Sequence, residues 1–375
     1  MLLKEVIEFK NGKKKPSTKG QIPIYGGNGV LDYTDQSNYD GQTLIVGRVG
    51  AYCGCVYSHY GKCWISDNAI VGKVIEGNDF YYCYYLLKRL NLNARHVGSG
   101  QPLMTQAILN NIEVDLPSYS IQKKIGKILK NIDDKIELNN KINNNLFELL
   151  KLEFREKFYN KEEKDSYLIE YISETIGGDW GKENPEGNNN TKVYCVRGAD
   201  IPSMEYGNKG NAPIRYILKK NYKNKRLDPN NIIIEISGGS PTQSTGRTAY
   251  ITKSILNMYD SPLLCTNFCR AIETKSDILA PFIYMNLKLM YEDDIFFNWE
   301  NGTTGIKNLA LNDMLSNLEV KSPDEKELKD YYLLFNNIMN QISSNSNENI
   351  KLEQLRDALL PKLMNVEIDL DNIEI

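Results

Sequence analysis

The chain has 375 residues, 41% of them hydrophobic and 25% charged, an ordinary composition for a folded protein with room for two or three domains. The net charge of −3 excludes a globally basic nucleic-acid binder, although a local basic surface stays possible. No apolar run approaches the ~20 residues of a membrane-spanning helix, and the N-terminal residues lack the apolar stretch of a signal peptide. We therefore expect a cytoplasmic protein with no membrane partner.

Residues 1–117 carry the pattern of a strand-rich domain. Short β-prone runs at 43–47, 54–57 and 69–74 predict strands, and glycine-rich turns separate them. Tyrosines and leucines at 79–92 form the one helical pattern in this part of the chain. We predict several short strands and a single helix.

Seven cysteines and two histidines bear on metal binding and redox state. Cys53, Cys55, His59 and Cys63 are the best candidate metal cluster, but their spacing matches no familiar zinc signature. Buried, reduced thiols in strands are the favoured interpretation, and we expect no metal site.

Residues 118–162 change to a helical period. Apolar side chains recur at steps of three and four, which predicts a long amphipathic helix of coiled-coil type, interrupted at Lys135 and Asn139. From residue 121 to 158 it would be ~57 Å long at 1.5 Å per residue. The residues expected to pack on a second helix or bind a partner are Ile125, Ile128, Ile132, Ile142 and Leu146.

Residues 163–322 repeat the strand-rich pattern, with predicted strands at 231–236, 247–252 and 268–274 and a helix at 282–291. Residues 323–375 predict a second long helix and a C-terminal tail. Asp324 can cap this helix, because Glu327 follows at the capping-box spacing. Its expected packing or partner-binding residues are Leu328, Tyr331, Phe335, Ile338, Leu352 and Leu355.

Two stretches of the chain are related to each other. Adding 206 maps Asn111, Glu113 and Pro117 onto Asn317, Glu319 and Pro323, and the same offset places Leu103 on Leu309. The two strand-rich parts also begin alike, with an offset of 165 between residues 3–7 and 168–172. A chain that builds two similar units, each followed by a long helix, is suited to address two similar targets.

Signatures of catalysis are missing from the sequence. There is no G-x-x-x-x-G-K-[ST] phosphate loop, no N-P-P-[FY] methyltransferase motif, and no G-x-G-x-x-G after a predicted strand. Both histidines lie in the first strand-rich part, so a duplicated Ser–His or Cys–His site is excluded. We predict no catalytic residues in this chain.

Several short sequence motifs occur in a characteristic order along the chain. They are I-P-I-Y-G-G-N-G at 22–29, I-V-G-R-V-G at 45–50, W-I-S-D-N-A at 64–69, the segment 98–132, and L-E-Q-L-R-D-A-L-L-P-K-L at 352–363. In this order the chain resembles the specificity (S) subunits of type I restriction–modification systems. The second unit departs most, because E-I-S-G-G at 235–239 replaces the glycine-arginine phrase.

The resemblance implies an α+β fold. Two pseudo-repeated target-recognition domains, 1–117 and 163–322, would be separated by two long antiparallel coiled-coil helices, 118–162 and 323–375. It also implies a non-catalytic subunit that reads a bipartite site on double-stranded DNA. Two methyltransferase (M) subunits and restriction (R) subunits would be its partners. No cofactor is expected in this chain, whereas S-adenosylmethionine, ATP and Mg²⁺ are expected on the partner subunits.

Loop residues with suitable groups are the candidate DNA contacts. Lysines offer charge to phosphates, arginine pairs well with guanine, and asparagine or glutamine pairs with adenine. In the first unit the candidates are Lys13, Lys14, Lys15, Asn28, Arg48, Tyr52, Asn68, Ser99 and Gln101. In the second unit they are Arg197, Thr242, Gln243, Ser244, Arg247, Thr303 and Lys307.

Two other interpretations compete with DNA specificity. One is a coiled-coil scaffold that binds proteins and reads no DNA, and the other is an enzyme with an unrecognised site. DNA binding with and without methyltransferase subunits tests the first, and methyl transfer by the isolated chain tests the second.

Overall fold

The computed structural model describes residues 1–98, 100–240, 242–302, 307–368 and 370. Its contacts divide the chain into two compact units. Unit 1 combines Met1–Ile136 with Lys351–Ile375, and unit 2 is Glu137–Ile350. Two long helices, α3 (Tyr119–Phe154) and α9 (Glu325–Met364), each contribute residues to both units. None of the helices in the described residues is both long and apolar enough to cross a membrane.

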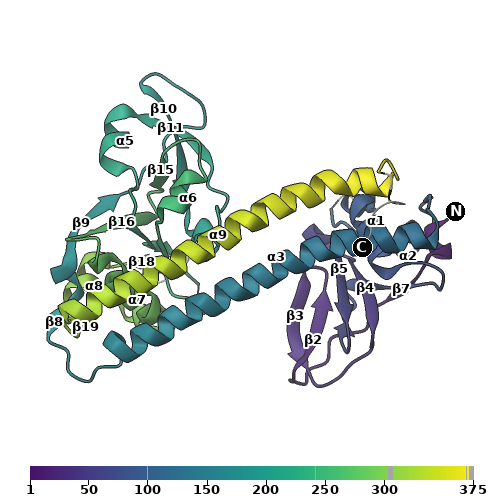
Figure 1. The fold of residues 1–375 in the computed structure, drawn as a ribbon, viewed down its shortest axis with the longest axis horizontal. Coiled ribbons are helices and arrows are strands. Elements are labelled where there is room, and N and C mark those ends of the chain that lie inside the picture. The colour runs from purple at the N-terminus through teal and green to yellow at the C-terminus, as the bar shows by residue number, and fades with distance from the viewer. Residues whose placement is uncertain (99, 241, 303–306, 369, 371–375) are drawn as a thin grey trace. The chain divides into compact units, whose positions relative to one another are not determined.

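Unit 1 contains two small sheets and a covering helix (Figure 1). The first sheet is antiparallel, in the order β1 (Ile7–Asn11), β7 (Ala69–Val74), β4 (Gln42–Gly47), β5 (Val56–Tyr60). The second has the order β3 (Gly29–Thr34), β2 (Ile22–Gly26), β6 (Trp64–Ile65).

Two short helices accompany these sheets, α1 (Phe80–Arg89) and α2 (Gln106–Asn110). The Asp79 carboxylate caps α1 by accepting from the Tyr82 backbone N–H at 2.8 Å. One face of α1, including Tyr82, Tyr85 and Leu86, is buried in the core that also holds the strand residues of the first sheet. The predicted strand-rich domain and its helix at 79–92 are therefore present, whereas the prediction of a single helix is wrong, because α2 is a second one.

Unit 2 is larger and repeats this plan with additions. Its main sheet has the order β14 (Thr248–Tyr250), β12 (Ile232–Glu235), β16 (Cys269–Thr274), β9 (Ile172–Gly177), and is antiparallel throughout. The smaller sheets are β11 (Ile214–Leu218), β10 (Asn189–Val196), β15 (Leu263–Cys265); β13 (Ser237–Gly238), β18 (Lys307–Leu309), β17 (Glu300–Asn301); and β19 (Glu319–Val320), β8 (Ser166–Tyr167). The helices are α4 (Ile201–Glu205), α5 (Lys219–Lys225), α6 (Lys253–Asn257), α7 (Leu279–Glu292) and α8 (Leu311–Asn317).

The duplication read from the sequence is visible in equivalent hydrogen bonds. Leu2 bridges Glu113 in unit 1, and Tyr167 pairs with Glu319 in unit 2. In both places a glutamate three residues later accepts from the backbone N–H of the first residue, at 3.0 Å. The offsets of 165 and 206 therefore hold at the two ends of each unit.

The offset changes inside the units, and one assignment from the sequence is wrong. Met104 donates its backbone N–H to Arg48 O at 2.8 Å, and in unit 2 Leu309 donates to Ile236 O at 2.9 Å. Leu309 thus corresponds to Met104, and not to Leu103. The helix α8 of unit 2 spans seven residues where α2 of unit 1 spans five, which accommodates the one-residue slip.

The two long helices are antiparallel and their seam differs from the predicted one. Pairs such as Asp133–Arg356 and Asn143–Ser346 show that partner numbers fall as those of α3 rise. In the second half of α3 the buried positions are Asn139, Asn143, Phe147, Leu150 and Phe154. The predicted seam continued through Ile142 and Leu146 because those positions carry the apolar residues. The actual seam passes through Asn139, which was predicted to interrupt it, and through Asn143.

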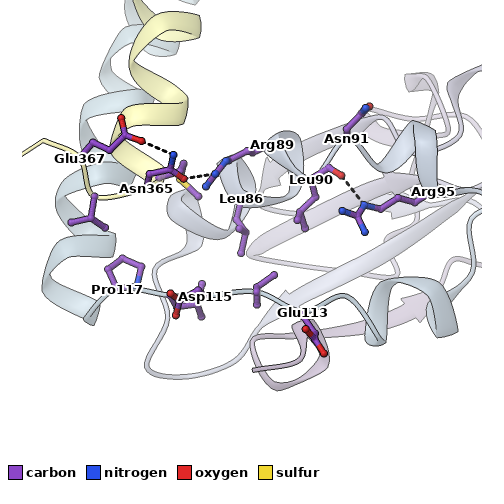
Figure 2. Close-up of a pocket in the computed structure, with 14 residues that line it drawn as sticks. Leu86, Arg89, Leu90, Asn91, Arg95, Glu113, Asp115, Pro117, Asn365 and Glu367 are labelled. Atoms are coloured by element: carbon purple, nitrogen blue, oxygen red, sulfur yellow. Dashed lines mark hydrogen bonds between the residues drawn. The ribbon is translucent and has the colours of Figure 1, made fainter.

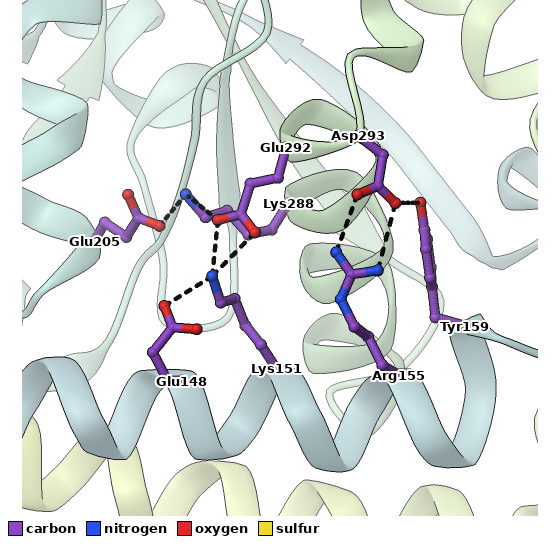
Figure 3. A network of polar contacts seen from close by, with 8 residues as sticks. All are labelled: Glu148, Lys151, Arg155, Tyr159, Glu205, Lys288, Glu292 and Asp293. Carbon is purple, nitrogen blue, oxygen red and sulfur yellow. Dashed lines mark hydrogen bonds and ion pairs between the residues drawn. The ribbon is translucent and has the colours of Figure 1, made fainter. Parts of the chain in front are cut away.

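A charged network fixes α3 to α7 inside unit 2 (Figure 3). Lys151 of α3 lies 3.0 Å from the Glu292 carboxylate of α7, and Lys288 bridges Glu292 and Glu205. One turn further along, Arg155 pairs with Asp293 at 3.0 Å. Because Lys151 and Lys288 are largely buried, the network constrains the rotation of α3 as well as its position.

Candidate nucleic-acid interface

Three backbone segments of unit 1 meet at the end of β4. A Cβ added to Gly47 would lie 2.2 Å from Tyr52 O and 2.7 Å from Gly27 O, so only glycine fits there. The turn after β2, the turn after β4 and β4 itself are therefore in direct contact. This contact places Asn28 and Tyr52 beside Arg48, although the three are separated in sequence.

Arg48 and Asn68 are joined at the same edge. The backbone N–H of Arg48 donates to Asn68 O at 2.9 Å, and the Arg48 guanidinium donates to Asp67 O at 3.2 Å. Asn28 accepts from the Tyr57 hydroxyl at 3.3 Å, and Tyr52 is 50% exposed. The structure thus brings four of the predicted contacts of unit 1 to one edge.

The three predicted lysines follow β1 and lie on an exposed loop. The backbone N–H of Lys13 donates to Ile65 O at 2.9 Å, which holds this loop against the turn that precedes Asn68. Lys15 pairs with Asp32 at 2.7 Å, and this pair lowers the pKa of that carboxyl. Gln101 is exposed beside this edge, whereas Ser99 lies outside the described residues.

The two candidate arginines of unit 2 are paired with carboxylates. Arg247 donates twice to the buried Glu235 carboxylate, at 2.9 and 2.6 Å, and these hydrogen bonds raise the arginine pKa. Arg197 makes a similar fork to Asp200, at 3.0 and 3.1 Å. Planar pairs of this kind hold the guanidinium in one orientation.

The remaining candidates of unit 2 differ in accessibility. Lys307 pairs with Glu300 at 2.6 Å, and Gln243 donates to the Tyr291 hydroxyl at 3.2 Å. Ser244 is buried with 3% exposure, so its side chain is not available at the surface. Thr242 is exposed, and Thr303 lies outside the described residues.

Sheet register shows that the two edges correspond. Gly47 pairs with Ala69 in unit 1, and Glu235 pairs with Cys269 in unit 2. The backbone N–H of Arg48 donates to Asn68 O, and the backbone N–H of Ile236 donates to Phe268 O. Asn68 therefore corresponds to Phe268. The glutamate of unit 2 therefore occupies the position of the tightly packed glycine of unit 1.

Two aromatic residues at this edge of unit 2 were not predicted. Phe268 is 58% exposed and Trp180 is 37% exposed, and both line one hollow with Arg197. The sequence offsets of the repeat do not reveal these two residues. Phe268 falls at the position of Asn68 only after the strands are aligned through their hydrogen bonds, because the offset there is 200 and neither 165 nor 206.

The predicted helix residues divide between buried and exposed positions. Ile142 is 38% exposed and Leu355 is 48% exposed, so both stand on the outer faces of their helices. Ile128, Leu146 and Leu352 are partly buried. The fully or nearly buried members are Ile125, Ile132, Leu328, Tyr331, Phe335 and Ile338.

The candidate metal cluster is not assembled. Cys53 belongs to the main core of unit 1 and Cys63 to a separate small core, where burial raises its pKa to about 11. His59 instead contacts the Tyr25 hydroxyl at 3.1 Å. Among the described residues no group of three His, Cys, Asp or Glu side chains could hold a metal ion.

A hollow of about 850 Å³ in unit 1 has none of the candidate contacts in its lining (Figure 2). It is lined by the end of α1, by residues 113–117 and by the segment after α9. Arg89 donates to Asn365, which donates to Glu367 at 2.7 Å. These bonds attach the segment after α9 to unit 1, and the mixed charges give the hollow no evident ligand.

The comparisons with known proteins agree on one family. A family model described as the type I restriction modification DNA specificity domain matches residues 1–148. The chain is 32% identical over 111 residues to the EcoprrI type I specificity subunit of Escherichia coli, a match that covers 30% of this chain and 28% of that protein. It is 24% identical over 430 residues to the MjaIX specificity subunit of Methanocaldococcus jannaschii, covering 99% and 93%.

A solved structure has the same fold. The S subunit of a type I restriction–modification system from M. genitalium superposes with a TM-score of 0.60 at 16% identity, covering 97% of this chain and 95% of that one. The α+β fold predicted from the sequence, with two strand-rich units and a long antiparallel helix pair, is confirmed. The chain is therefore similar in sequence to specificity subunits of type I restriction–modification systems, and it has the fold of one of them.

Proposed function

We propose that this chain is the non-catalytic specificity subunit of a multisubunit type I restriction–modification enzyme. Each unit reads one half of a bipartite site on double-stranded DNA. Two M subunits supply methyl transfer, and R subunits supply cleavage. In this proposal S-adenosylmethionine, ATP and Mg²⁺ belong to those partners.

One observation carries this proposal. The same edge of the main sheet recurs in both units, and in each unit it gathers polar or aromatic side chains from separate loops. Side chains from several loops on a rigid sheet are a common arrangement for recognition. Two such edges in one chain fit two half-sites.

The edges differ in chemistry, which fits two different half-sequences. Unit 1 presents lysines, Asn28, Arg48 and Asn68, which suit phosphates and base edges. Unit 2 presents paired arginines beside exposed aromatic rings. Two identical readers would predict two identical half-sites.

An exposed apolar stripe on α3 supports partner docking. Leu138, Ile142, Leu149 and Leu152 are 38–64% exposed and follow heptad-like steps, with Asn145 between them. All four lie in unit 2. An outward stripe with this period fits a helix of a partner, such as an M subunit.

The docking stripe is tested with charge substitutions. Leu149→Asp with Leu152→Asp should leave the chain folded and prevent co-purification with M subunits. Ile338→Asp is the contrasting variant, because Ile338 is 7% exposed and its change should unfold unit 2. If the stripe variant still assembles with M subunits, the stripe is not the docking surface.

The proposed function is tested by methylation mapping. The chain is co-expressed with its M subunits in a host that lacks adenine methylation, and methylated adenines are mapped in the genome. A two-part motif with an unspecified gap is the expected result. Methyl transfer by the isolated chain would instead support an enzyme, and assembly without DNA preference would support a scaffold.

A further inference from the structure

We propose that Trp180 and Phe268 form an apolar reading site for a thymine, whose C5-methyl group enters the hollow between them. The inference rests on the proposed function and adds one chemical determinant of the half-site read by unit 2. The hollow has a volume of about 310 Å³ and is lined by Trp180, Arg197, Thr266, Asn267 and Phe268.

Both apolar rings are exposed to solvent, although burial would be more favourable for each of them. Phe268 lies in the turn between β15 and β16, and Trp180 lies shortly after β9. Single apolar side chains on a surface are common, but two large rings that converge on one hollow are a typical contact site. Apolar contact with the thymine methyl is one of the standard ways to read a base in the major groove.

Contacts within the protein position both aromatic residues without a ligand. The Arg215 guanidinium lies 3.8 Å from the centre of the Trp180 ring and pairs with Glu183 at 3.0 Å. Phe268 is held through its carbonyl, which accepts from the Ile236 N–H at 2.8 Å. A preformed apolar surface loses little entropy on binding.

Close backbone contact joins the two segments that carry the rings. A Cβ added to Gly178 would lie 1.9 Å from Thr266 O, so the chain before Trp180 lies directly on the chain before Phe268. Gly12 has the same relation to Ser66 O, also at 1.9 Å. This glycine pair shows that both units build the same corner.

Charge at the wall of the hollow favours DNA over an apolar partner. The Arg197 side chain is 41% exposed, and its fork to Asp200 uses Nε and Nη2. Within the described residues no hydrogen bond is found for its Nη1 group. Asn267 is exposed beside it, and an asparagine amide suits the adenine paired with a thymine. The Arg197 cation and the Asn267 amide beside the apolar rings therefore suit a base pair of DNA, which is a polyanion.

Unit 1 lacks this site at the corresponding corner. The equivalence of Gly12 with Gly178 places Lys14 at the position of Trp180, and Asn68 is at the position of Phe268. Reading through a methyl group is therefore expected in one half-site only.

The experiment uses the full chain assembled with its M subunits and DNA that carries the mapped motif. Each thymine of the half-site read by unit 2 is replaced in turn by deoxyuridine, which lacks only the methyl group. Replacement at one position should lower the affinity of the complex for DNA about three- to tenfold. The reason is that a buried methyl group contributes roughly 0.8 kcal/mol and base discrimination about 1–3 kcal/mol. Phe268→Ala should lose a similar factor on the thymine DNA and be insensitive to deoxyuridine at that position.

Matched controls separate this proposal from the proposed function. Deoxyuridine in the half-site read by unit 1 should change the DNA affinity of the wild type and of Phe268→Ala by the same factor. Tyr60→Ala removes an aromatic ring of unit 1 that is 78% exposed, and it should leave the deoxyuridine effect intact. Absence of any motif preference in the wild-type complex would contradict the proposed function itself.

Three results would overturn the thymine site while leaving the proposed function in place. The half-site of unit 2 could contain no thymine on either strand. Deoxyuridine could leave the affinity unchanged at every position. Phe268→Ala could weaken binding to the motif and to unrelated DNA by the same factor, which would indicate stacking without base identity. Thermal unfolding confirms that Phe268→Ala is folded, and Trp180→Leu provides a second variant.

Discussion

At the scale of single residues, unit 2 uses arginines that are already paired. Glu235 is 4% exposed, and its carboxylate accepts two hydrogen bonds from the Arg247 guanidinium. A buried carboxylate without its partner is costly, so we expect Arg247 mainly to stabilise the edge of β12, with DNA contact as a proposed second role. The Gln243 side chain donates to the Tyr291 hydroxyl and pairs with no buried charge in the described contacts, so we expect it to be freer to read a base.

Removal of Arg247 should therefore affect folding. Arg247→Ala should lower the free energy of unfolding by ~3–5 kcal/mol, because Glu235 is left buried and unpaired. Arg247→Met combined with Glu235→Gln should lose less, since no charge remains buried. Thermal unfolding measures both, and Gln243→Ala should instead alter preference in one half-site with an unchanged melting temperature. An Arg247→Ala protein of normal stability would refute the structural role.

Asp200 gives a pH-dependent prediction. Burial alone would raise its pKa, but the Arg197 guanidinium and the backbone N–H groups of Arg197 and Asn211 outweigh burial and lower it below 3.8. A lowered pKa stabilises the fold above the unfolded-state value of ~3.9, and this stability is lost as the pH falls through the folded-state pKa.

Asp200→Asn should thus cost ~1–3 kcal/mol of unfolding free energy between pH 5 and 8, and progressively less below pH 4. Urea unfolding at a series of pH values measures the difference. Asp228→Asn is the matched control, because its pair with Arg226 lies at the surface and should contribute less than ~1 kcal/mol. A difference that does not depend on pH would show that the carboxylate charge is unimportant.

At the scale of elements, a belt of polar side chains sits inside the helix pair of unit 2. Asn143 donates to Ser346 Oγ at 3.2 Å and accepts from the Asn345 amide at 2.8 Å, and Asn139 donates to Asn349 at 2.9 Å. Buried asparagines in a helix seam select one register, because any shift leaves them without partners. The belt also contacts another segment of unit 2, because the Ser346 hydroxyl donates to Tyr206 O at 3.0 Å.

Asn143→Leu tests the belt. The substitution leaves the Asn345 amide and the Ser346 hydroxyl without this partner, and should lower the unfolding free energy by ~1–3 kcal/mol. Asn144→Leu is the matched control, because Asn144 has the same chemistry at an exposed neighbouring position and should change stability by less than ~0.5 kcal/mol. Denaturant unfolding compares them, and equal effects would mean that the belt has no role in stability.

At the scale of the whole molecule, both long helices run through both units. Their antiparallel pairing means that a change of length in one helix must be matched in the other. The boundary between the units falls after Ile136 in α3 and after Ile350 in α9. Insertions at these two points leave the hydrogen bonds within each unit intact.

A matched insertion tests whether the helices set the gap of the DNA motif. Seven residues added at both points keep the seam period and lengthen each helix by ~10 Å. The methylated motif should keep both half-sequences and gain about three base pairs in its gap, since base pairs rise ~3.4 Å. Methylation mapping measures the gap. Insertion into α3 alone should abolish assembly, and an unchanged gap after the matched insertion would exclude a spacer role.

Features that depend on local chemistry could be predicted from the amino-acid sequence. Repeated starts at Leu3 and Leu168, the cap at Asp324 and the apolar periods of both long helices follow from neighbouring residues, and the structure contains them. The lack of catalytic motifs and the order of family phrases are also properties of the chain alone. These features led to the fold class that the structure has and to the family whose members the chain resembles.

The contacts between side chains from distant parts of the chain could not be predicted in this way. The seam passes through Asn139 and Asn143 because their partners on α9 lie about 200 residues away, and no local pattern contains that pairing. Arg247 was predicted as a base reader, yet a glutamate twelve residues earlier holds it through the register of β12 and β14. Phe268 joins Trp180 only where the turn between two strands lies against the segment after β9. Such contacts depend on strand register and on backbone packing, which are set by the fold as a whole.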